Sequence, residues 1–161
     1  MKIMSEDDLL KSANAFLQSL CDKFGLKYIE VRAEDFYGLD MLRPAKFCSD
    51  SNYIAINKFY LKVYHQHILH EFRHYWQREK YPIVFYWWLK DHIQLYEDYQ
   101  EARDEKGTRL SYLYCPLEKD ADAFEKSGGV EGKEVELINP IMDESYWREI
   151  LKEKTVYKSA F

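Results

Sequence analysis

No glycine or proline interrupts residues 58–80, and apolar or aromatic side chains recur in this segment at the spacing of one helical face. The recurring side chains are Leu61, Tyr64, Ile68, Phe72, Tyr75 and Trp76. The pattern predicts one long helix, which should end before Pro82 because a residue that precedes proline disfavours helical backbone. Side chains four residues apart in this segment should therefore lie one turn apart on the same helix face.

The segments on either side of this helix predict a mixed α+β fold. Ser5, with Asp8 three residues later, is typical of a helix start, and Gly25 is typical of a helix end. Short strands are expected at 27–32, 45–49 and 53–57. Further helices are expected at 83–106, 116–126 and 143–154, with a brief extended piece at 112–115 and a weak strand or surface loop at 130–138. The predicted order is an N-terminal helix, a small three-stranded sheet, the long helix and further helices, which is an α+β arrangement.

The composition limits the setting and the partners. The chain has 161 residues, 47% of them hydrophobic, and a formal net charge of −5. This is the size of one domain, and the acidic balance disfavours nucleic acid as the main partner. The acids that follow Met4 stand where a signal peptide needs an apolar run, and the apolar run at 83–89 is too short for a bilayer span of about 20 residues. We therefore expect no membrane span. The cysteines are three in number, and none is in CxxC spacing: Cys21, Cys48 and Cys115. We expect them to be reduced thiols of a cytoplasmic protein.

The helix predicted over residues 58–80 contains the sequence His70-Glu71-Phe72-Arg73-His74. The two histidines are four residues apart, so both imidazoles can bind one Zn²⁺ from the same helix face. Glu71 lies beside them and can take a proton from the water that the metal activates. The alternative is a solvated helical face with two ordinary histidines. In either case Arg73 is expected to be a charge on the helix surface rather than a substrate clamp.

A zinc site needs a third protein ligand, and the helix predicted over residues 116–126 offers two carboxylates on one face, Glu118 and Asp122. One carboxylate can bind the metal. The other can accept the free ring N–H of a liganding histidine and fix its tautomer. The small side chains of Ala121 and Ala123 would let two helices approach closely. The alternative is an ordinary acidic helix start, because carboxylates are favourable in the first turn.

Together the two motifs, His70-Glu71-Phe72-Arg73-His74 and Glu118-Lys119-Asp120-Ala121-Asp122, resemble the HExxH and ExxAD motifs of gluzincin-type zinc metallopeptidases. The chain is most similar, over about residues 26–126, to the small ImmA/IrrE-type metallopeptidases of bacteria and phages. The resemblance implies that His70, His74 and Glu118 bind one Zn²⁺ per chain, that Glu71 is the general base and that Asp122 supports a liganding histidine. It also implies a protein or peptide substrate, which would lie as an added strand along the edge strand of the small sheet. That edge is expected near Tyr53, Ile54, Ala55, Ile56 and Asn57.

The segment between the two motifs predicts an aromatic-rich helical insertion at about 81–107 within a single zincin-like domain spanning 1–161. Its apolar run at 83–89 is expected to pack in the core, with a partner-binding or membrane-surface patch as the alternative. If residues 83–99 bind a protein partner, the chain could instead be a non-catalytic zincin-fold adaptor or inhibitor of a phage or mobile element.

Four other residues near the motifs leave alternatives open. His67 lies three residues before His70 and could reach the edge of the site. A purely structural zinc would need a fourth protein ligand such as His67 or Cys115. Tyr112 and Tyr114 lie just before the predicted helix with Glu118, so either phenol could stabilise an oxyanion or contact substrate. The remaining histidines, His65 and His92, are expected to face solvent.

Overall fold

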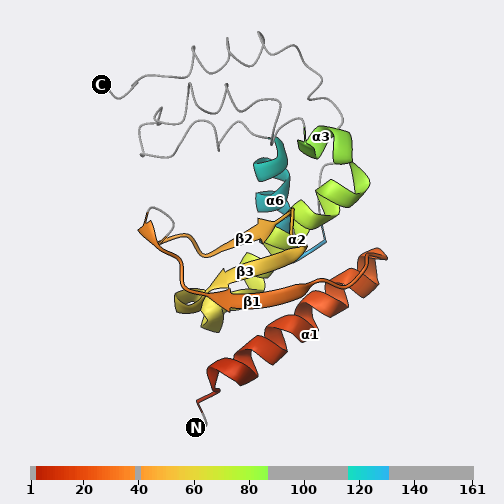
Figure 1. Cartoon of the computed structure of the whole chain (residues 1–161). Helices are drawn as coiled ribbons and strands as arrows, with labels where there is room; N and C mark the ends of the chain where they lie inside the picture. Colours follow the sequence, from red (N-terminus) through yellow and green to blue (C-terminus); the bar gives the residue numbers. More distant parts are fainter. Residues whose placement is uncertain (1–2, 39–40, 87–115, 131–161) are drawn as a thin grey trace, which may run out of the picture.

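The computed structural model describes residues 3–38, 41–86 and 116–130 (Figure 1). Its elements, in chain order, are α1 (Glu6–Phe24), β1 (Glu30–Glu34), β2 (Ala45–Cys48), β3 (Tyr53–Asn57), the 3₁₀ helix η2 (Lys58–Val63), α2 (Tyr64–Lys80), α3 (Pro82–Tyr86) and α6 (Pro116–Lys126). The predicted α+β fold is confirmed, with an N-terminal helix and a small three-stranded sheet before the helix that carries the two histidines. The elements expected at 112–115 and 143–154 lie outside the described residues, as do residues 87–106 of the helix expected at 83–106 and all but the first residue of the segment expected at 130–138.

Helix α1 begins and ends at the predicted residues. The Ser5 hydroxyl accepts a hydrogen bond from the backbone N–H of Asp8 at 3.1 Å, which satisfies one donor of the first turn. At the other end Gly25 has a φ of +67°, a left-handed conformation that costs glycine little. Between these caps, Ala13, Leu17 and other apolar side chains are buried in the core.

The sheet has the order β1-β3-β2, so β3 is its central strand. Strand β3 pairs in parallel with β1 and antiparallel with β2, and Ile54, Ala55 and Ile56 are all completely buried. The prediction that residues 53–57 form the edge strand is therefore wrong. Both sides of β3 already carry strand partners, so a substrate cannot add to it as a further strand.

The outer edge of β1 is covered by a side chain of α1. The Asn14 amide oxygen accepts a hydrogen bond from the backbone N–H of Val31 at 2.8 Å, and the Asn14 nitrogen donates to the Val31 carbonyl at 3.1 Å. Asn14 thus binds the backbone of β1 much as a neighbouring strand would. The other edge of the sheet is β2, which packs against α2.

The segment predicted as one long helix divides into η2 and α2. The Asn57 side chain accepts a hydrogen bond from the backbone N–H of Phe59 at 3.1 Å and donates to the carbonyls of Met41 and Arg43. These bonds start a tighter 3₁₀ turn directly after β3, and the regular α-helix begins only after Val63. The histidine pair still lies within a continuous α-helix, as predicted.

Helix α6 packs against α2, on the side of the molecule where α3 also lies (Figure 1). Phe124 of α6 is completely buried, with its ring centroid 6.0 Å from that of Phe72 on α2. This packing aligns the two predicted motifs, although they are far apart in the sequence. It also explains the small Ala121, which is fully buried.

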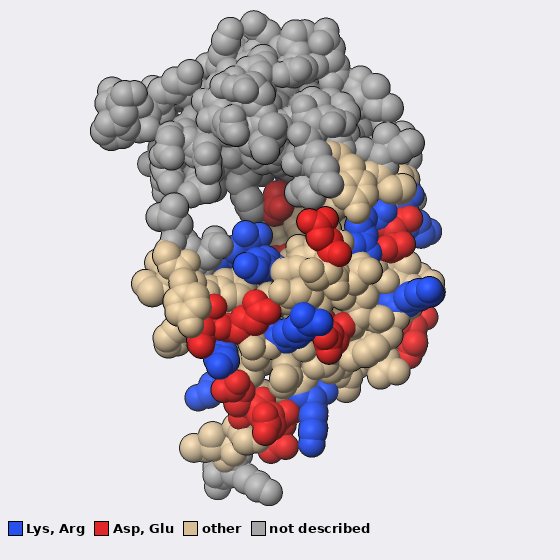
Figure 2. Space-filling model, in the orientation of Figure 1, with Lys and Arg blue, Asp and Glu red and all other residues tan. Residues whose placement is uncertain are grey.

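Over the described part of the face in Figure 2, acidic and basic side chains are interspersed, and no basic stripe crosses it. Among the helices of residues 3–38, 41–86 and 116–130, none has both the length and the apolar character that a bilayer span requires.

Candidate metal centre

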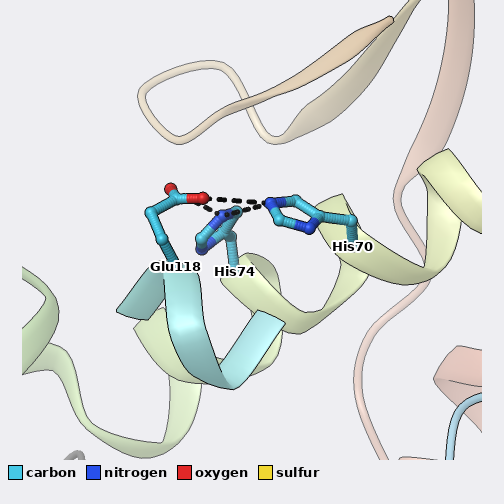
Figure 3. A group of neighbouring side chains, drawn as sticks. All are labelled: His70, His74 and Glu118. Atoms are coloured by element: carbon cyan, nitrogen blue, oxygen red, sulfur yellow. Dashed lines mark hydrogen bonds and ion pairs between the residues drawn. The ribbon is translucent and has the colours of Figure 1, made fainter. Parts of the chain in front are cut away.

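Three side chains from α2 and α6 point toward one another (Figure 3). His70 and His74 lie one turn apart on α2, and Glu118 lies in the first turn of α6. His70 Nε2 is 3.1 Å from Glu118 Oε2, His74 Nε2 is 3.1 Å from Glu118 Oε1, and the two ring nitrogens are 3.3 Å apart. The predicted ligands therefore meet at one point.

The chemistry and spacing of this group fit a bound metal ion. Zinc bonds of about 2.0–2.1 Å in a tetrahedral arrangement place neighbouring ligand atoms about 3.3 Å apart, close to the separations found here. The three side chains are 11–24% exposed, so they are only partly accessible to water. Two imidazoles and a carboxylate could thus hold a metal ion and leave a fourth tetrahedral position for another ligand.

The second nitrogen of His70 faces a pair of carboxylates on α6. His70 Nδ1 is 3.1 Å from Asp122 Oδ1 and 3.6 Å from Glu125 Oε1. Asp122 lies where the sequence predicted a carboxylate that supports a liganding histidine. Glu125 was not predicted, although its position seven residues after Glu118 places it on the same helix face. Within the described residues, His70, Asp122 and Glu125 form the other group that could hold a metal ion.

Glu71 connects the histidine helix to the sheet. Its Oε2 accepts a hydrogen bond of 2.8 Å from the backbone N–H of Phe47, and its side chain is buried. Phe47 lies in β2, the edge strand next to α2, and pairs with Ile54 of β3. The carboxylate of Glu71 is therefore held between the edge of the sheet and the helix that carries the two ligands.

Arg73 is buried, which contradicts the prediction of a helix-surface charge. It is 4% exposed, and its Nε and Nη2 donate to the two Asp120 oxygens at 2.7 and 3.3 Å. Its guanidinium lies 3.5 Å from the centre of the Trp76 ring. The sequence alone did not identify Asp120 as the partner, because the pairing depends on how α6 lies against α2.

The charges in the centre shift the pKa values of its members. Burial lowers the pKa of His70, but hydrogen bonds to Asp122 and Glu118 outweigh this effect and raise the pKa to about 11. Burial likewise lowers the pKa of His74, but the Glu118 carboxylate outweighs burial and leaves the pKa raised. Burial raises the pKa of Glu118, but the two histidines outweigh it and leave the pKa well below its usual range. Without a metal ion, the carboxylate is therefore ionised beside protonated imidazole.

Of the other residues considered in the sequence analysis, those that the structure describes do not belong to the His70, His74 and Glu118 group. His67 belongs to neither of the groups that could hold a metal among the described residues, and its ring contacts Tyr60 instead. His65 is exposed, as predicted. Phe85, within the predicted apolar run, is buried in the core. The predictions for Tyr112, Tyr114, Cys115, His92 and the rest of the aromatic segment fall on residues outside the described part of the chain.

No protein-family model and no curated protein matches the sequence, and no solved structure matches the fold.

Proposed function

We propose that this chain is a zinc-dependent metallopeptidase that hydrolyses peptide bonds of a protein substrate. The observation that carries the proposal is the convergence of His70 and His74 with Glu118, which lies 48 residues after His70, while Glu71 follows His70 on the same helix. Nitrogen and oxygen ligands in this number and spacing are those of a catalytic zinc site with three protein ligands.

Cys21 and Cys48 are free thiols, which supports the cytoplasm as the proposed setting.

Zn²⁺ bound by these residues would supply a Lewis acid that lowers the pKa of a water molecule and polarises the scissile carbonyl. The residues of the chain supply proton transfer. Glu71 takes a proton from the attacking water as the new C–O bond forms, and passes it to the amine nitrogen as the C–N bond breaks. The hydrogen bond from the Phe47 N–H holds Glu71 Oε2, and the second carboxylate oxygen would take the proton.

We propose that the substrate lies nearest to β2. Strand β2 replaces residues 53–57, which were predicted to be the substrate-binding edge strand. Strand β2 borders α2 and carries Phe47, the hydrogen-bond partner of Glu71. The Ala45 carbonyl accepts a hydrogen bond from Arg43, and the Ser49 carbonyl accepts one from Arg78. A substrate that pairs along β2 would have to displace these arginine contacts and leave the Phe47 N–H bound to Glu71.

The proposal is tested by cleavage of a proteome-derived peptide library, with products identified by mass spectrometry. Zinc-loaded protein should produce new peptide termini, zinc-free protein should not, and restored zinc should restore cleavage. A folded, zinc-loaded protein that leaves the whole library uncut would contradict the proposal. Tight capture of one host protein by that uncut preparation would favour the predicted alternative, a non-catalytic binding protein.

We expect zinc binding to release protons and to weaken as the pH falls. The metal needs unprotonated imidazole nitrogens, whereas the metal-free protein holds a proton on His70, whose pKa is raised to about 11. Protons therefore compete with zinc more strongly at lower pH, and the apparent affinity should rise with pH across the neutral range. Calorimetric titration with Zn²⁺ in two buffers of different ionisation enthalpy measures the protons released. An affinity that does not change with pH, with no proton release, would contradict this coupling.

A further inference from the structure

Gln77 lies three residues after His74 on α2, and its side chain is completely buried. It does not belong to either motif, and the mechanism proposed above does not use it. We propose that Gln77 is a positioning residue of the metal centre, which fixes the ring of His74 and ties α2 to the first turn of α6. The inference rests on the proposed metal site and adds a residue to it.

The orientation of the Gln77 amide follows from its partners on α6. Its nitrogen lies 3.0 Å from the Leu117 carbonyl oxygen and 2.8 Å from Asp120 Oδ2. Both of these atoms are hydrogen-bond acceptors, so the amide nitrogen with its two N–H groups must face them. The amide oxygen must then point the other way, and it lies 2.8 Å from His74 Nδ1.

The amide oxygen in turn determines the tautomer of His74. An amide oxygen can only accept a hydrogen bond, so His74 Nδ1 must carry the proton and donate it to Gln77. A neutral His74 ring then has its lone pair on Nε2, the nitrogen that is 3.1 Å from Glu118. This is the nitrogen through which the ring would bind the metal, and the hydrogen bond at Nδ1 keeps the ring in that orientation.

The α6 partners of Gln77 flank the third ligand. Leu117 directly precedes Glu118 and Asp120 follows it by two residues, so Gln77 contacts both sides of the turn that presents the carboxylate. Asp120 is itself held by Arg73, which donates to both of its oxygens. A buried chain of hydrogen bonds thus runs from Arg73 through Asp120 and Gln77 to His74. It sets the positions of His74 and Glu118 relative to each other.

The two histidines are therefore oriented by different groups. His70 Nδ1 faces the Asp122 carboxylate, whose side chain is 35% exposed, whereas His74 Nδ1 donates to a fully buried neutral amide. A neutral partner fixes the tautomer of His74 without placing a further carboxylate beside a centre that already contains Glu118.

The first test is Gln77→Met, which keeps a flexible side chain of similar size and removes every hydrogen bond of the amide. We expect the folded variant to bind Zn²⁺ about 10–100-fold more weakly, the usual loss when an outer partner of a liganding histidine is removed. Gln66→Met is the matched control, because Gln66 is exposed on the same helix, and its affinity should equal that of the wild type. Zinc affinities are compared by chelator competition, well below the melting temperature of each variant. If Gln77 had only a structural role, the substitution would lower the stability of the folded protein under these conditions but leave its zinc affinity unchanged.

The second test uses only the wild-type chain, so it stands even if Gln77→Met does not fold. Two-bond ¹H–¹⁵N NMR of the zinc-loaded protein should show His74 protonated at Nδ1 and bound to metal through Nε2. A metal-bound Nδ1, or a Gln77→Met variant with wild-type zinc affinity, would overturn the role of Gln77 and leave the zinc site itself in place. If the wild type binds no Zn²⁺, the proposed function fails instead.

Discussion

Glu71→Gln is expected to abolish peptide hydrolysis while the protein keeps its metal. The amide has nearly the same shape as the carboxylate, and its oxygen can still accept the hydrogen bond from the Phe47 N–H. It cannot take a proton from water, however, and general-base catalysis is typically worth about 10²–10⁴-fold in rate. The loss should therefore fall on the rate of cleavage and not on zinc content or melting temperature.

The matched control for this variant is Glu79→Gln. Glu79 lies on the same helix, its side chain is 42% exposed, and it pairs with Arg78 instead of the metal centre. Both variants remove one negative charge from α2, so a general effect of charge would appear in both. We expect Glu79→Gln to cleave the peptide library at the wild-type rate. Cleavage by Glu71→Gln at that same rate would show that Glu71 is not the base.

Glu118→Gln is expected to lose zinc. An amide oxygen is a neutral and much weaker ligand than a carboxylate, and Glu118 contacts both histidine nitrogens at 3.1 Å. Removal of a direct ligand should weaken binding by more than the roughly 10–100-fold loss expected for an outer partner. Zinc at about 100 times its Kd stabilises a folded protein by about 2.7 kcal/mol, so zinc should raise the melting temperature of the wild type and not of this variant.

Glu125→Gln is the control that distinguishes the two possible metal groups. Glu125 also lies on α6, but it faces His70 Nδ1 at 3.6 Å and belongs to the group formed with Asp122. If the metal binds His70, His74 and Glu118, the melting temperature of Glu125→Gln should still rise when zinc is added. The reverse pattern, zinc retained by Glu118→Gln and lost by Glu125→Gln, would place the metal in the other group.

Local signals in the sequence were enough to predict several elements of the fold. Each of these signals acts on the backbone close to it. Pro116 occupies the first position of α6, and Ser5 and Gly25 cap the two ends of α1. The spacing of His70 and His74 likewise needed only the geometry of one helix. These predictions are confirmed because neighbouring residues determine them.

The predictions that failed depend on segments that are distant in the sequence. Strand β3 is central because β1 pairs with it on one side and β2 on the other, and a strand pattern alone carries no information on that order. Arg73 is buried because the Asp120 carboxylate of α6 pairs with it and the Trp76 ring lies against its guanidinium. Trp76 is three residues away on the same helix, but the sequence does not show that Asp120 meets Arg73. The same helix packing makes Gln77 a member of the centre.

The most direct test of the metal centre is the X-ray absorption spectrum of the zinc-loaded chain, freed of any affinity tag and loaded with one equivalent of zinc. We expect only nitrogen and oxygen ligands at about 2.0–2.1 Å, with the multiple-scattering pattern of two imidazoles. A sulfur ligand at about 2.3 Å, or fewer than two imidazoles, would contradict binding by His70, His74 and Glu118.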